Sequence, residues 1–168
     1  MKRLIFIFTL AFSIQFVWAQ NNIKENIAAM NKLLVDFSPE ESANFNVIEQ
    51  SGIVEQNFNN LIQRYNLSEI ELVRVKKKEA GFSVSFSCKD SGKCVSLIRE
   101  NGTNVNLVNT SYFFKIDAAA NSFAENAQRL IQHFKTENDS CKINLFIAEN
   151  GKTNRLKINT PKTKPKEV

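Results

Sequence analysis

Residues 81–88 read GFSVSFSC, and from Phe82 to Cys88 apolar side chains alternate strictly with serines. Successive side chains of a β-strand point to opposite faces, so this alternation predicts a strand with one buried and one hydrated face. A sheet with one wet face is typical of antiparallel pairing, because parallel sheets are usually covered on both sides. The segment therefore predicts an antiparallel sheet resting on a core. Its inward side chains are Phe82, Val84, Phe86 and Cys88.

The chain around this segment consists of short apolar runs separated by turn residues such as Ser51-Gly52 and Asn101-Gly102. Turn signals at intervals of about eight to twelve residues are typical of an antiparallel meander. The pattern predicts seven strands, near residues 45–50, 53–58, 61–66, 69–78, 82–89, 93–100 and 111–117.

Two further segments have the period of an amphipathic helix. Apolar side chains recur at steps of three and four in residues 22–37, and Ser38-Pro39 ends that pattern. The clearer helix is predicted over 117–135, with Asp117 as its N-cap. We expect its apolar face to cover the sheet, each large buried side chain contributing about 1.5 to 3 kcal/mol. The core stripe of this helix contains Phe123, Ala127, Leu130 and Phe134.

Residues 1–19 have the three-part build of a secretory signal peptide. Lys2 and Arg3 precede an apolar run over 4–17, which ends in Val17-Trp18-Ala19. A membrane anchor needs about 20 consecutive apolar residues. The polar residues that interrupt this shorter run are Thr9, Ser13 and Gln15. We therefore expect a secreted or periplasmic protein that is cut after Ala19.

The remaining length predicts a single domain over residues 20–159, because about 150 residues bury enough surface for one ordinary core. Within that domain, residues 141–158 predict a C-terminal β-hairpin with Asn150-Gly151 at its turn. Residues 160–168 contain two prolines and three lysines and predict a disordered basic tail.

The net charge of +5 does not indicate a nucleic-acid-binding surface. Two of its positive charges belong to the predicted signal peptide and much of the rest belongs to the tail. The basic run inside the domain is Lys76-Lys77-Lys78. It has two interpretations, a solvated strand end that keeps a sheet edge from pairing and an anion site, and the first is favoured.

Three cysteines are an odd number for an exported chain, so two of them are expected to pair. In the segment CKDSGKC, a three-residue hairpin loop over 90–92 would place Cys88 directly across from Cys94. Such a short disulfide loop contributes about 2 kcal/mol. Cys141 is left either buried as a small apolar residue or free to pair between molecules.

The sequence offers no catalytic constellation. Its single histidine, His133, lies beside the apolar stripe of the predicted helix, and no nucleophile, phosphate-loop or dinucleotide motif is present. Glu69 with Glu71, and Glu40 with Glu41, are read as solvated carboxylates instead of acid and base pairs. Three scattered cysteines and one histidine lack metal-ligand spacing. We therefore predict a non-enzyme without metal or cofactor.

Seven antiparallel strands followed by one amphipathic helix resemble the layout of pleckstrin-homology-like domains. The chain is also similar to small exported bacterial proteins of unknown function, on the KDSGKC turn, the strand SYFFKID and the alanine-rich helix after it. The resemblance implies an α+β fold, a seven-stranded sandwich or barrel closed by the helix. It does not imply phosphoinositide binding, because the first hairpin loop, Ser51-Gly52, lies among acidic residues instead of basic ones.

Two functions remain open at this point. The first is an exported interaction module that binds a peptide or protein partner along a sheet edge or in the groove beside the terminal helix. The second is a carrier of small amphiphilic ligands, since the fourteen phenylalanines can line a cavity as readily as fill a core.

Overall fold

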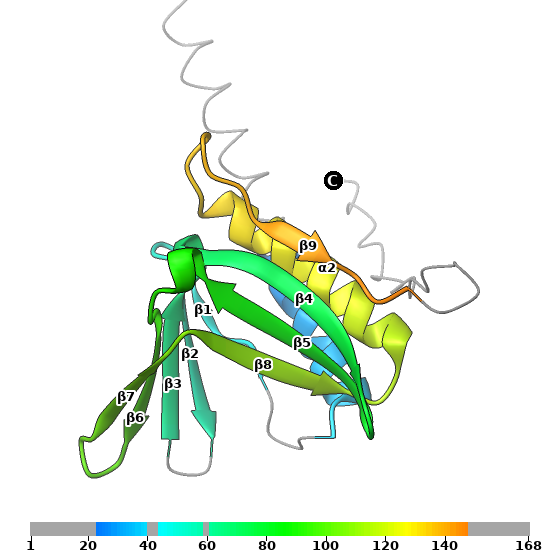
Figure 1. Cartoon of the computed structure of the whole chain (residues 1–168), viewed down its shortest axis with the longest axis horizontal. Helices are drawn as coiled ribbons and strands as arrows, with labels where there is room; N and C mark the ends of the chain where they lie inside the picture. Colours follow the sequence, from blue (N-terminus) through cyan, green and yellow to red (C-terminus); the bar gives the residue numbers. More distant parts are fainter. Residues whose placement is uncertain (1–22, 40–43, 59–60, 148–168) are drawn as a thin grey trace, which may run out of the picture.

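The computed structural model describes residues 23–39, 44–58 and 61–147. These residues form an α+β molecule with two α-helices and two β-sheets (Figure 1). The predicted signal peptide, the predicted tail over 160–168 and the turn of the predicted C-terminal hairpin lie outside the described residues.

The five-stranded sheet, called sheet A, has the order β1-β2-β3-β6-β7. Its strands are β1 (Val47–Ile48), β2 (Ile53–Phe58), β3 (Leu61–Asn66), β6 (Val95–Arg99) and β7 (Asn104–Leu107). The four-stranded sheet, called sheet B, has the order β8-β5-β4-β9. Its strands are β8 (Asn109–Phe114), β5 (Gly81–Cys88), β4 (Ile70–Lys78) and β9 (Lys142–Asn144). Two short 3-10 turns connect strands, η1 (Leu67–Glu69) and η2 (Lys89–Ser91).

One chain segment belongs to both sheets, because only Val108 separates β7 from β8. At its start, Arg99 N donates to Thr103 O (2.9 Å), and β6 pairs with β7. Further on, Cys88 N donates to Val108 O (2.9 Å), and β5 pairs with β8. Odd-numbered and even-numbered residues of a strand direct their amides to opposite sides. The two partner strands therefore lie on opposite sides of this shared segment, which joins the sheets as one bent surface (Figure 1).

The bent surface differs from the predicted seven-stranded sandwich or barrel. Within the described residues it contains nine strands in two sheets, and these do not close into a barrel. The sequence pattern predicts no strand over residues 104–107, yet this segment pairs with β6 over four residues. The first strand of the predicted C-terminal hairpin corresponds to β9. This strand pairs in parallel with β4, a pairing that the hairpin prediction does not include.

The helix α2 (Asp117–His133) covers the inner face of sheet B, as predicted for this segment. Phe123, Ala127 and Leu130 of its stripe are buried, and Phe134 is partly buried just past the helix end. The expected N-cap is wrong by one position. Ile116 occupies the cap, and the Asp117 carboxylate accepts from the neighbouring Ala118 N (2.7 Å) within the first turn.

The N-terminal helix over residues 23–37 completes the core. Its Met30, Leu33 and Leu34 are buried, and Asn31 exchanges two hydrogen bonds with the backbone of Phe45 (2.6 and 3.0 Å). Aromatic rings fill the space between the sheets and α2. Phe45, Phe86, Tyr112 and Phe123 contact one another with ring centroids 5.0 to 6.4 Å apart.

Candidate functional site

The predicted disulfide between Cys88 and Cys94 is confirmed, with a Cα–Cα distance of 5.7 Å. The predicted hairpin around it is wrong, because β5 and β6 belong to different sheets. Asp90 and Ser91 take positive φ values of 53° and 55°, whereas Gly92 has a φ of −62°. The disulfide lies where the shared segment passes between the sheets, and the Cys88 Sγ is 3.7 Å from Leu107 O. It therefore links the end of sheet B to the start of β6 in sheet A.

Beyond the disulfide, β8 forms an edge of sheet B. Because Cys88 N bonds to Val108 O, the even-numbered residues of β8 face β5, and Asn109, Ser111 and Phe113 direct their N–H and C=O groups away from it. No strand among the described residues pairs with that side. We call these three residues the β8 edge. Just past it, Lys115 N donates to Phe37 O at the end of the N-terminal helix (2.9 Å).

Exposed apolar side chains concentrate along the same stretch of chain. Nine large apolar side chains of the described residues are exposed, and five of them lie between residues 105 and 116. These five are Val105, Leu107, Val108, Phe113 and Ile116. Apolar side chains gathered beside an unpaired strand edge are typical of a surface that is covered by a partner.

Sheet A presents further apolar side chains near the β8 edge. Gln63, Leu97 and Val105 stand opposite one another across β3, β6 and β7, so they lie on one face of sheet A. Thr110 of β8 reaches this face, since its Oγ1 donates to Gln63 Oε1 (2.8 Å). Leu97 is half-buried and Val105 is 41% exposed.

A buried hydrogen-bond network fixes β8 against sheet A. Tyr112 donates to Gln56 Oε1 (2.7 Å), and Gln63 Nε2 donates to the same oxygen (3.0 Å). The hydroxyl groups of Tyr65 and Tyr112 are 2.7 Å apart. Gln56 Nε2 also donates to the backbone of Asn44. Because the network satisfies the polar groups in this part of the core, the β8 edge is held in a fixed position.

Burial also affects the titration of this network. Loss of solvent raises the pKa of Tyr65 well above its ordinary value of 10.0, and the neighbouring Tyr112 hydroxyl raises it further. A phenol with a raised pKa stays protonated at neutral pH. Tyr65 therefore acts as a hydrogen-bonding group here and offers no base for catalysis.

Two surface cavities lie away from the β8 edge. One, of about 290 Å³, lies on sheet A. Its lining residues are Asn57, Leu61, Ile62, Ile98, Arg99 and Glu100. The other, of about 370 Å³, lies between the N-terminal helix and α2 and contains His133 beside Arg129 and Asn26. The ring of His133 packs against Phe134 (5.2 Å).

The carboxylates singled out in the sequence are not brought together as a pair. Glu71 accepts a hydrogen bond from Asp90 N (3.1 Å) and lies 3.8 Å from Lys142. Glu69 belongs to η1, and Glu40 and Glu41 lie outside the described residues. Within the described ranges no group of three potential metal ligands occurs.

Cys141 is the free cysteine of the described residues, and it is 5% exposed. Burial raises the pKa of its thiol to about 11. Of the two roles left open for Cys141, the buried one is therefore observed. A protonated, buried thiol reacts slowly with a second cysteine.

Comparison with protein-family models, with curated proteins and with solved structures finds no match for this chain. The pleckstrin-homology-like resemblance thus stays a prediction. None of the helices in the described part of the chain has the length and apolar character needed to cross a membrane.

Of the shared segment on which the candidate site stands, the sequence predicts the β8 half, as a strand near 111–117, but it predicts no strand for the β7 half. Its signal was the alternation of Asn104, Val105, Asn106 and Leu107, which has the period of a strand.

Proposed function

We propose that the protein is an exported, non-enzymatic interaction module that binds an extended segment of a partner protein at the β8 edge. The observation that carries this proposal is the outward direction of the backbone groups of Asn109, Ser111 and Phe113. Such an edge accepts a further strand through main-chain hydrogen bonds, and neighbouring side chains then select the sequence.

The side chains around the edge favour a peptide with alternating character. A strand added beside β8 places every second side chain toward sheet A, where Leu97 and Val105 supply an apolar surface. Its remaining side chains face solvent beside Ser111. We expect the partner segment to alternate between apolar and polar residues.

The carrier hypothesis has weaker support. Phe45, Phe86, Tyr112 and Phe123 occupy the space between the sheets in which an amphiphilic ligand was expected to lie. Binding at the outer edge therefore fits the geometry better than binding inside.

Proline substitution tests the edge directly. Ser111→Pro removes an amide that points away from β5, so the pairing of β8 with β5 is retained while the edge loses a donor. The matched control is Asn106→Pro, because the Asn106 amide points away from β6 on the other free edge of the shared segment. The probe is a set of peptides selected from a random display library against the full chain.

We expect the selected peptides to protect the amides of Ser111 and Phe113 from hydrogen exchange. Ser111→Pro should weaken peptide binding at least about tenfold, because the peptide loses one or two backbone hydrogen bonds to the edge. Asn106→Pro should not weaken peptide binding. Equal weakening by both variants, or protection elsewhere in the chain, would contradict the proposal.

Export is tested separately. The disulfide is compatible with an oxidising compartment, and the basic start, the apolar run and the end Val17-Trp18-Ala19 are those expected of a signal peptide. Expressed from its own start, the protein should be recovered outside the cytoplasm with Gln20 as its first residue. Recovery of uncut chain in the cytoplasm would overturn this part of the proposal.

A further inference from the structure

The outward face of sheet B is basic. In β4, the buried Val73 and Val75 stand opposite Phe86 and Val84 of β5, so the alternate residues of β4 point outward. The outward cations of β4 are Arg74, Lys76 and Lys78. Lys142 of β9 stands opposite Leu72 on the same face.

Hydroxyl groups lie directly beside these cations. Ser85 stands opposite Arg74 and its Oγ donates to Arg74 O (3.3 Å), whereas Ser83 stands opposite Lys76 and is buried. On the other side of β5, Ser111 of β8 stands opposite Ser85. The outward positions of the four strands of sheet B thus combine cations with the exposed hydroxyl group of Ser111, and the acidic side chain beside them in β4 is Glu71, whose carboxylate lies 3.8 Å from Lys142.

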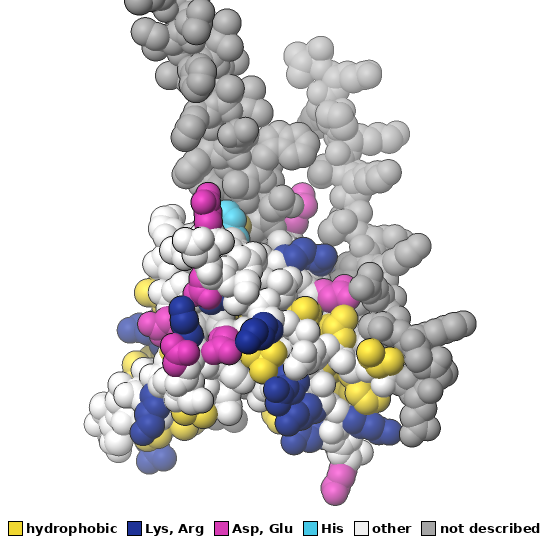
Figure 2. Space-filling model, turned by 45° about the horizontal axis from the view of Figure 1, so that its top comes forward, with side chains coloured by type: hydrophobic (Ala, Val, Ile, Leu, Met, Phe, Trp, Pro, Cys, Tyr) yellow, Lys and Arg dark blue, Asp and Glu magenta, His cyan; other side chains and the backbone are white. Residues whose placement is uncertain are grey.

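Apolar side chains adjoin the basic face at the end where β4 meets β5. Phe113 of β8 stands opposite Ser83 and is 40% exposed. Ile116, between β8 and α2, is 39% exposed, and Ile147 is 60% exposed and follows Phe146, whose ring contacts the inward-facing Phe82 (5.0 Å), so these two side chains lie at the rim of this end and not on the outward face itself. Figure 2 shows hydrophobic side chains gathered beside lysine and arginine side chains on this part of the surface.

Acidic residues offset only part of this charge. Lys76, Lys77, Lys78 and Lys115 are exposed at this end. The acidic residues near them are Glu79 in the turn after β4 and Asp117 at the start of α2. Glu71, further along β4, lies 3.8 Å from Lys142.

We infer that this surface, made of the basic face and of Phe113, Ile116 and Ile147, docks on an anionic lipid bilayer. Lysines beside a negatively charged leaflet are attracted by its surface potential, and the exposed Ser111 hydroxyl can donate to a phosphate oxygen. Exposed aromatic and aliphatic side chains at the rim of a basic surface enter the headgroup region, where a soluble polyanion offers them no apolar partner. The combination of both features therefore favours a bilayer over a soluble polyanion. This inference goes beyond the proposed peptide site and uses side chains of the outer face instead of the β8 backbone edge.

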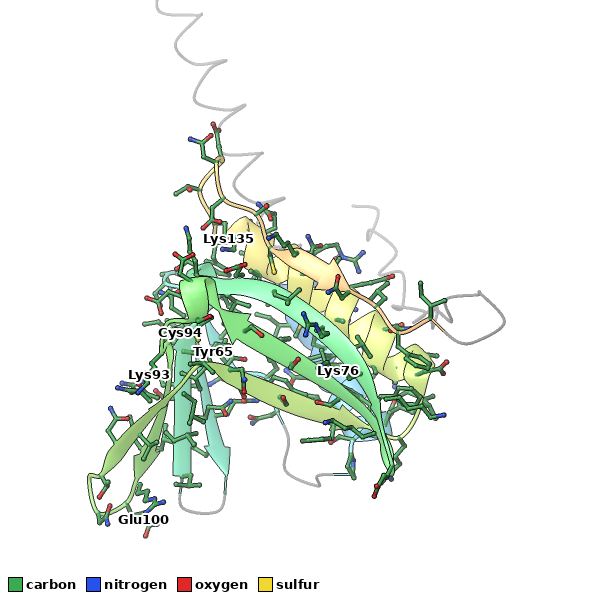
Figure 3. All side chains as sticks on the ribbon, viewed as in Figure 1. Tyr65, Lys76, Lys93, Cys94, Glu100 and Lys135 are labelled. Atoms are coloured by element: carbon green, nitrogen blue, oxygen red, sulfur yellow. A yellow bond between two sulfur atoms is a disulfide. The ribbon has the colours of Figure 1, made fainter. Side chains whose placement is uncertain are left out.

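Flotation with vesicles tests the inference. The probes are vesicles of phosphatidylglycerol mixed with phosphatidylcholine, and vesicles of phosphatidylcholine alone. All variants keep the same N-terminal and C-terminal segments, so differences among them report on this surface. The charge variant is Lys76→Gln with Lys78→Gln, and its control is Lys93→Gln, at an exposed lysine beside η2 on the other side of the molecule (Figure 3).

We expect binding to the anionic vesicles only, weakened by added salt. The double charge variant should bind about 25-fold more weakly, about fivefold for each lysine, and Lys93→Gln should bind like the unchanged chain. Phe113→Ser should weaken vesicle binding about tenfold. Asn109→Pro, which removes another outward amide of the β8 edge and leaves Ser111 in place, should leave vesicle binding unchanged, and this separates the inference from the peptide proposal.

Three outcomes would overturn the inference. They are equal binding to neutral and anionic vesicles, equal effects of Lys93→Gln and of the double charge variant, and unchanged vesicle binding in Phe113→Ser. If vesicle binding is absent while soluble polyphosphate binds and depends on Lys76 and Lys78 alone, the surface recognises a soluble polyanion instead.

Discussion

The side chain of Lys135 is fully buried, which is uncommon for a lysine. Its ammonium group donates to Ser68 O (3.1 Å) and to the Asp139 carboxylate (3.1 Å). Lys89, in η2, lies 3.3 Å from the same carboxylate. Through Lys135 and Lys89, Asp139 thus connects the end of α2 with the two turns η1 and η2. A buried ammonium group that lacked this carboxylate partner would destabilise the fold.

These contacts also determine the direction in which the pKa of Asp139 is shifted. Hydrogen bonds from Lys135, and then from Lys89, lower its pKa below the ordinary value of 3.8. A carboxyl group with a lowered folded-state pKa stabilises the protein above its unfolded-state pKa, and this contribution is lost as the pH falls through the lower folded-state value. The loss is therefore expected below about pH 4.

Asp139→Asn tests this contact. The substitution removes the charge that compensates Lys135, so the free energy of unfolding at pH 7 should fall, and its acid dependence should be shallower than in the unchanged chain. Urea unfolding at a series of pH values measures both effects. The control is Asp36→Asn, because Asp36 pairs with the exposed Lys32 (2.8 Å) and such a pair contributes little. Equal effects of the two variants would contradict the role given to Asp139.

At the scale of elements, the end of α2 is fixed by a turn of sheet A. Gly52, between β1 and β2, has a φ of +67°, and a Cβ atom placed on it would lie 2.7 Å from the Phe134 ring. The ring of Phe134 therefore packs directly on the backbone of this turn. Gly102 has a similar φ of +79°, and a Cβ atom there would meet nothing within 4 Å.

These two glycines provide a matched pair of substitutions. Gly102→Ala should cost about 1 to 2 kcal/mol, because only the left-handed backbone conformation opposes the alanine. Gly52→Ala should cost about 1 to 3 kcal/mol more, since it adds an overpacked contact with Phe134. Urea midpoints at a common pH measure the difference. If the two variants lose the same stability, the contact between Phe134 and the turn is not maintained in solution.

Local patterns predicted some elements and missed others for identifiable reasons. The alternation in β5 and the apolar stripe of α2 can be recognised in the sequence because each element packs one continuous face on the core. β7 was not predicted, since all four of its residues are exposed and it pairs in sheet A with β6 alone. The β8 edge was equally hidden, because an edge depends on which strands are absent beside it, and this follows from long-range pairing.

At the scale of the whole molecule, the disulfide joins the two sheets at the point where the shared segment crosses between them. Cys88 ends β5, Cys94 precedes β6, and Val108 bonds to Cys88 N. A short loop closure of this kind contributes about 2 kcal/mol. Because the buried network from Tyr65 to Tyr112 also crosses the gap between the sheets, we expect the sheets to stay associated after reduction but to open more often at the junction.

Reduction of the disulfide tests this coupling. With reductant, the unchanged chain should lose about 2 kcal/mol of stability, whereas a chain with Cys88→Ala and Cys94→Ala should lose none. Hydrogen exchange should become faster at Cys88 and Val95, on both sides of the junction, because local opening there exposes the amides of two sheets. Cys141→Ala is the control for effects on the remaining thiol. Faster exchange confined to η2 would mean that the disulfide orders only its own loop and does not couple the sheets.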